Sequence, residues 1–202
     1  MFAYCSAMIC RLTLFLALVS CALSVRAATE IYQFDPAHSS VAFTIRHFLA
    51  QVPGQFAKVT GQIDLDPADF TRSFVTATVD LASVSTHNEN RDKHLRTPDF
   101  FDTATYPAAT FKSTRWVKTG DNTYDVTGEF ILHGVTKELT LPVKYLGRTE
   151  GNRGATLTGW QATVTLKRSD FGIGKPERSI GDEVVVVLNV EARLQQPEAK
   201  TP

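Results

Sequence analysis

The feature that most constrains this chain is a strict alternation of apolar residues with polar or small ones, which recurs along most of its length. In the first clear run, Val41, Phe43 and Ile45 occupy every second position. Successive side chains of a β-strand point to opposite faces, so this pattern predicts a strand with one buried and one solvent-facing side. Because the buried sides must pack together, the chain is expected to fold into a β-sheet structure.

The same alternation predicts many further strands. They are expected at residues 63–65, 75–81, 124–126, 130–132, 139–145, 160–166 and 184–190, which together indicate about eight to ten strands. The last of these runs is almost continuously apolar, so we expect it to be covered on both faces. Turn-forming sequences at 120–122, 133–134 and 151–154 separate successive runs and predict antiparallel hairpins.

Only one stretch of the chain favours a helix, at residues 87–96, which Pro98 would terminate. One helix among many strands indicates a single all-β domain, either a barrel or a sandwich. A closed sheet of about eight strands is wide enough either to fill itself with side chains or to hold one slim ligand. We expect residues 171–183 to form a surface loop.

The N-terminal segment carries all the sulfur-containing residues, three Cys and two Met, within its first 21 positions. The apolar run after Arg11 is too short to span a membrane as a helix and is typical of a signal peptide. Cleavage after Ala27 is expected, which would leave an exported barrel domain at residues 28–196 and a flexible tail at 197–202. That mature chain has no thiol, so cysteine catalysis, cysteine-ligated metals and disulfides are excluded.

Two alternatives concerning this leader stay open. Translation could begin at Met8 rather than Met1, which would place a short basic segment directly before the apolar run. Residues 18–21 also resemble a bacterial lipobox, in which Cys21 would be lipidated and would anchor the protein to a membrane.

The charge balance argues against nucleic-acid binding, because Lys+Arg and Asp+Glu each number 21 and such proteins normally carry a basic excess. Metal binding is not indicated either. His87 and His94 lie seven residues apart with Asp92 nearby, whereas ligands on neighbouring helical turns are normally three or four apart. We therefore predict no metal and no cofactor.

Nucleophilic catalysis has no clear signature in the sequence. Ser39 and Ser40 lie beside His38, but the chain lacks the Gly-x-Ser-x-Gly sequence that presents a nucleophilic serine on a sharp turn. A β domain without catalytic motifs favours a carrier or binding module over an enzyme.

Several segments, taken in order, resemble the bacterial YceI-like family. They are 38–47 (HSSVAFTIRH), 90–95 (NRDKHL), 99–102 (DFFD), 106–107 (YP), 128–136 with LHGVT at its end, 168–173 (RSDFGI) and 180–184 (IGDEV). The resemblance covers about residues 30 to 194. It implies an eight-stranded antiparallel, lipocalin-like barrel that is exported to the periplasm and carries a polyisoprenoid, an isoprenoid quinone or a similar long-chain fatty amphiphile.

Candidate site residues follow from the alternation and from the resemblance. The alternation predicts a cavity lined by Val41, Phe43, Ile45, Phe111, Phe130 and Leu132. The alternative is that these side chains pack only against one another or against the helix, because parity does not say which face points inward. Arg91, Asp92 and His94 match the family's helix motif and are candidates for contacts with a lipid head group, with a purely structural, ion-paired lid as the alternative.

Two other functions remain open at this point. One is an enzyme that modifies a lipid or quinone with His94 or His47 as acid or base, and the other is a periplasmic stress protein whose barrel is packed solid. A carrier could also contact membranes transiently and could form a homodimer.

Overall fold

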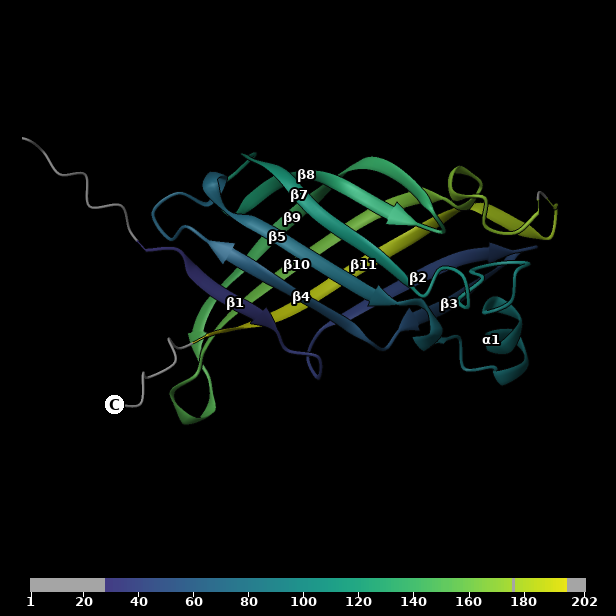
Figure 1. The fold of residues 1–202 in the computed structure, drawn as a ribbon, viewed down its shortest axis with the longest axis horizontal. Helices are drawn as coiled ribbons and strands as arrows, with labels where there is room; N and C mark the ends of the chain where they lie inside the picture. Colours follow the sequence, from purple (N-terminus) through teal and green to yellow (C-terminus); the bar gives the residue numbers. More distant parts are fainter. Residues whose placement is uncertain (1–27, 176, 196–202) are drawn as a thin grey trace, which may run out of the picture.

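The computed structural model describes residues 28–175 and 177–195 (Figure 1). The predicted signal peptide with Cys21, and the predicted tail at 197–202, lie outside these residues. The described chain contains one α-helix, α1 (Glu89–Leu95), and eleven strands. The strands are β1 (Glu30–Phe34), β2 (Ser40–His47), β3 (Ala50–Phe56), β4 (Val59–Leu65), β5 (Phe74–Asp80), β6 (Val84–Ser85), β7 (Ala108–Lys118), β8 (Thr123–Leu132), β9 (Val135–Glu150), β10 (Thr156–Lys167) and β11 (Ile180–Leu194).

The strands form one antiparallel sheet that closes into a barrel (Figure 1). The order around the barrel is β1, β4, β5, β7, β8, β9, β10 and β11, and β11 returns to pair with β1, where Tyr32 lies opposite Leu194. Three strands extend others beyond brief interruptions: β2 extends β1, β3 extends β4 and β6 extends β5. β11, for example, pairs with β1 and then with β2. The eleven strands therefore form eight staves of the barrel. The predicted eight-stranded antiparallel barrel is therefore confirmed.

Tight hairpins explain why strands adjacent in sequence are also adjacent in the sheet. Residues 119–122 connect β7 to β8, and His133 with Gly134 connects β8 to β9. These two residues have φ angles of 52° and 75°, the left-handed conformation that a two-residue type I′ turn requires at both positions. The antiparallel hairpins predicted from these turn sequences are present.

The helix is shorter than the predicted span of 87–96. Its N-cap is Asn88, whose side-chain oxygen accepts a hydrogen bond from the backbone N–H of Arg91, and a residue in this role begins a helix without belonging to it. His87 has a φ of 59°, which no right-handed helix accommodates. Short 3-10 helices occur at Phe70–Arg72, Leu81–Ser83, Asn152–Gly154 and Arg168–Phe171. Within the described residues, no helix has both the length and the apolar character needed to cross a bilayer.

Two predictions for the last part of the chain are wrong. β11 is not covered on both faces, because Val184 and Val186 face the interior while Val185 is 41% exposed on the outside. The outer face of β11 is exposed to solvent, although the sequence of this strand does not alternate between apolar and polar residues. The segment 171–183 is not simply a surface loop either, since Phe171 and Ile173 are buried and pack into the core.

Candidate functional site

A cavity of about 500 Å³ occupies the interior of the barrel, within the range of about 300–1,000 Å³ that is typical of small-molecule pockets. Its wall is formed by the inward-facing alternate positions of the strands, and it is overwhelmingly apolar. On β9, β10 and β11 the lining includes the aliphatic side chains of Leu139, Leu141, Val143, Ala162, Val164, Leu166, Val184, Val186, Leu188 and Val190. Such a wall favours an apolar ligand, because a polar group placed against it would lose its hydrogen bonds to water.

All six residues predicted to line a cavity lie on this wall: Val41, Phe43, Ile45, Phe111, Phe130 and Leu132. The inward face of β2 is thus the face that the alternation singled out. Contact of these side chains with a ligand stays a prediction. The aliphatic residues of β9 to β11 that line the cavity were not among the predicted site residues. The alternation of apolar and polar residues at 139–145 and 160–166 is the same pattern that identified the inward face of β2.

Aromatic rings fill the end of the barrel that holds the β9–β10 hairpin, opposite α1 in Figure 1. Trp116 and Trp160 form the end of the cavity lining, with ring centroids 5.8 Å apart and planes at 89°. Behind them, Phe70 contacts Tyr124, Tyr145 and Trp160 at centroid distances of 5.2–5.8 Å. This end therefore acts as an apolar floor.

The other end of the cavity, beside α1, is its mouth, and the lining there becomes charged. The charged or titratable residues of the mouth are Arg46, His47, Arg91, His94, Arg168 and Glu177. Apart from Arg168 they are solvent-exposed. An apolar interior with a predominantly cationic rim matches an amphiphile whose chain enters the barrel and whose polar head stays at the surface.

Arg91 and Asp92 of the helix are both bound to Thr86. The buried carboxylate of Asp92 accepts hydrogen bonds from the backbone N–H of Thr86 at 2.8 Å and from its hydroxyl at 2.5 Å. Arg91 donates to the Thr86 hydroxyl and carbonyl at 2.7 and 2.8 Å. Arg91 still lines the mouth, whereas Asp92 is turned to Thr86. In this structure Asp92 thus stabilises the start of the helix rather than facing the cavity, and Arg91 stays a candidate for head-group contact.

His94 also lines the mouth, and its Nε2 lies 3.2 Å from the Asp99 carboxylate. Its ring meets Phe100 edge-on at a centroid distance of 5.0 Å. The grouping of His87, His94 and Asp92 that the sequence suggested as a conceivable metal site is not assembled, because Asp92 is bound to Thr86 and His94 to Asp99.

Arg168 is a mouth residue that the sequence reasoning missed. It is only 7% exposed, and its guanidinium donates to the carbonyls of Gly181, Ile173, Lys175 and Ile180 at 2.9–3.4 Å. These bonds fold the segment between β10 and β11 over the cavity edge. A buried cation with carbonyl partners also makes the mouth more electropositive.

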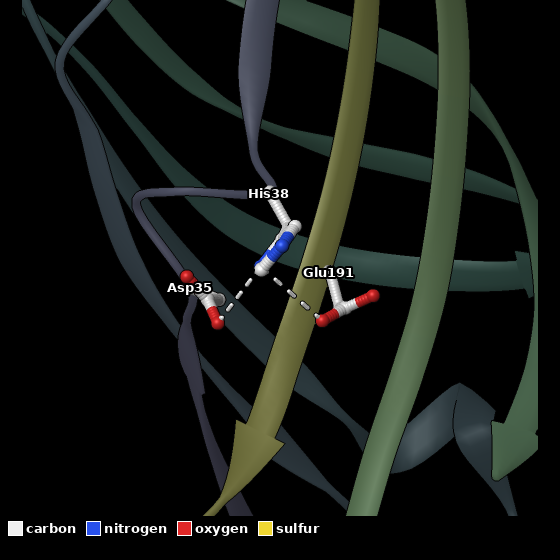
Figure 2. Close-up of side chains that lie close together, drawn as sticks. All are labelled: Asp35, His38 and Glu191. Carbon is white, nitrogen blue, oxygen red and sulfur yellow. Dashed lines mark ion pairs between the residues drawn. The ribbon is translucent and has the colours of Figure 1, made fainter. Parts of the chain in front are cut away.

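A separate polar cluster lies on the outer wall, where Asp35 and His38 meet Glu191 of β11 (Figure 2). His38 Nδ1 is 3.2 Å from the Asp35 carboxylate and 3.7 Å from that of Glu191, and Arg193 is 3.9 Å from Asp35. The hydrogen bond from His38, followed by that from the Ala37 N–H, lowers the pKa of Asp35. Both carboxylates therefore lie within 4 Å of His38, and the cluster ties the β1–β2 turn to β11.

Comparison with known proteins gives consistent results. A family model described as YceI-like domain matches residues 32–192. Protein YceI of Escherichia coli O17:K52:H18 is 35% identical over 183 residues, which is 90% of this chain and 95% of the relative. The crystal structure of Burkholderia cenocepacia BcnA is similar with a TM-score of 0.72 and 27% identity, covering 78% of this chain and 98% of that one.

A further structural neighbour shows a common fold only. It is a polyisoprenoid binding domain from Saccharophagus degradans, implicated in plant cell wall breakdown, with a TM-score of 0.61 and 21% identity. The similarity covers 81% of this chain and 98% of that domain.

Proposed function

Because the chain belongs to the YceI-like family, we propose that it is a periplasmic carrier that holds one long-chain amphiphile, with a polyisoprenoid as the first candidate. The observation that carries this proposal is the apolar cavity of about 500 Å³ with charged groups confined to its mouth. The apolar chain would occupy the interior, and the head group would lie between α1 and the segment held by Arg168. An isoprenoid quinone or a fatty amphiphile offers the same chemistry and is a second choice of ligand.

The energetics of the cavity support such a ligand. Burial of apolar chain is worth about 0.8 kcal/mol per CH₂ group, so two isoprene units would contribute about 8 kcal/mol before the costs of ordering are deducted. No buried charge is needed for this affinity. The name of the Saccharophagus neighbour supplies a candidate ligand class, and the apolar wall of this chain's own cavity suits a ligand of that class.

Export to the periplasm follows from the predicted signal peptide and is part of the proposal, as is a non-catalytic role. The alternative of a stress protein with a solidly packed barrel does not fit, because the barrel contains a cavity. A lipid-modifying enzyme is the second candidate function, because His94 lies at the mouth with Asp99 as a partner that could orient its ring.

The test is to purify the protein from its native host without detergent, extract it and identify the bound compounds by mass spectrometry. We expect a long-chain compound in a constant ratio to protein. Repeated absence of any such compound, combined with failure to take up polyprenols, would overturn the proposal. Conversion of the bound lipid to a product by the wild type but not by His94→Ala would select the enzyme instead.

A further inference from the structure

We infer that the tip of the β2–β3 hairpin, Phe48 and Leu49, inserts into the surface of an anionic membrane and holds the mouth of the cavity against the bilayer. The inference rests on the proposed function for what is exchanged there, a long-chain amphiphile. It adds the partner from which the ligand is taken and the residues that make the contact.

The hairpin tip is the most exposed apolar feature of the described residues. Leu49 is fully exposed and Phe48 is 61% exposed. Two-residue hairpin turns normally select Gly, Asn or Asp, and Phe48 has a φ of 50°, which is disfavoured for a bulky side chain. The turn thus has a strained backbone, and it gains no burial from Leu49 and little from Phe48. Strain of this kind is typical of functional sites, and folding stability does not explain it.

The tip is held firmly at the rim of the cavity. The backbone N–H of Phe48 donates to the carbonyl of Ser179 at 2.7 Å, and the guanidinium of Arg46 donates to the carbonyl of Phe48 at 2.7 Å. The Phe48 ring meets His47 edge-on at a centroid distance of 4.9 Å. Since Arg46 and His47 both line the mouth, a membrane that receives the tip also lies against the opening.

The charges around the tip favour an anionic surface. Exposed Arg46 lies on the hairpin, exposed Lys175 and Arg178 precede Ser179, and Glu177 is the acidic residue of that stretch. The exposed acidic residues Asp182 and Glu183 follow in β11, where the Asp182 carboxylate accepts hydrogen bonds from Ser169. The Glu177 carboxylate accepts a hydrogen bond from the Ser179 hydroxyl. Apolar side chains flanked by a basic excess bind the interface of membranes with anionic lipids, so we expect the association to weaken as salt rises.

The experiment measures flotation of ligand-free protein with phosphatidylcholine vesicles, with and without phosphatidylglycerol. Phe48→Ser with Leu49→Ser should weaken association with the anionic vesicles about tenfold or more and should leave the melting temperature unchanged, since neither side chain is buried. The matched control is Leu146→Ser, whose side chain is 56% exposed on β9 near the floor and which should behave as the wild type. If the tip variant and the Leu146→Ser control associated equally with the anionic vesicles, the inference would be overturned, and a protein partner would be the next candidate for the tip.

A second variant tests the charge. Lys175→Gln with Arg178→Gln should reduce binding to anionic vesicles and should remove much of its salt dependence, and an unchanged salt dependence would count against the inference.

Uptake of a polyprenol separates docking from carriage. The tip variant should take up polyprenol normally from detergent micelles and slowly from vesicles. If the tip variant took it up from vesicles as fast as the wild type does, docking would be overturned. If the wild type binds vesicles but takes up polyprenol from neither source, the carrier function fails while docking stands.

Discussion

The aromatic ring of Phe43 lies directly against Gly54, its partner on the neighbouring strand β3. A Cβ atom at Gly54 would overlap the ring. Because the other side of Phe43 faces the cavity, the missing side chain at Gly54 lets the ring lie back along the wall. A glycine in a strand often marks such a close approach. This pair thus helps to keep the interior of the barrel open.

Gly54→Ala should therefore reduce ligand capacity more than stability. The ring of Phe43 can swing into the cavity, so we expect a loss of only about 1 kcal/mol in the free energy of unfolding. The space that the displaced Phe43 ring then occupies is no longer open to the ligand. The measurement is lipid content by mass spectrometry beside urea unfolding. Normal lipid content together with a large loss of stability would show that Phe43 cannot move.

Substitutions at adjacent positions of β2 should differ because they lie on opposite faces of the wall. Phe43→Asp places a carboxylate in the apolar cavity, which costs several kcal/mol unless the group is protonated or hydrated, and lipid retention should be abolished. Thr44 lies opposite Val185, which is exposed on the outer wall, so Thr44→Asp should retain lipid. Equal lipid contents of the two variants would contradict the assignment of the inner face.

Phe70→Ala should open the floor of the cavity. The ring packs against Tyr124, Tyr145 and Trp160, and its removal should cost about 2–4 kcal/mol of stability and speed ligand release. Phe74→Ala is the control, since that ring lies beneath Lys112 and is not part of the aromatic floor. The dissociation rate of a fluorescent fatty acid, compared between the variants, checks this expectation. Equal rates for both would mean that the remaining rings seal the floor.

Asp35→Asn should alter the dependence of stability on pH. The pKa of Asp35 is lowered in the folded protein, chiefly by the hydrogen bond from His38. Its contribution is present above its ordinary pKa of about 4 and is lost as the pH falls through the lowered value. The variant should therefore be less stable than the wild type near neutral pH, and the difference should shrink in acid.

Denaturant unfolding at several pH values measures that difference. Asp121→Asn, in the exposed β7–β8 turn, serves as the control for loss of a surface carboxylate. A constant difference between Asp35→Asn and the wild type across the acidic range would show that the His38 interaction does not depend on the carboxylate charge.

Much of the wall of the site could be predicted, and so could Arg91 and His94 at its mouth, whereas the aromatic floor and Arg168 could not. Val41, Phe43 and Ile45 were identified from alternation, and they do line the cavity. The same rule failed at β11, because Val185 is apolar and yet lies on the outer face. Of the helix residues, Asp92 was grouped with Arg91 by motif, but its carboxylate is taken up by Thr86.

The sequence by itself determined most of the strands, the hairpins at 120–122, 133–134 and 151–154, and which residues of β2 share one face, because alternation and turn preferences are local properties of the sequence. Alternation left barrel and sandwich open, and beyond the family resemblance only the tertiary structure decided that the sheet closes into a barrel, that Phe70 backs its floor and that Arg168 holds the edge of its mouth. Each of these depends on contacts between distant parts of the chain, such as Tyr32 with Leu194, Phe70 with Trp160 and Arg168 with Gly181. No pattern within a single strand encodes which distant residue will be its neighbour.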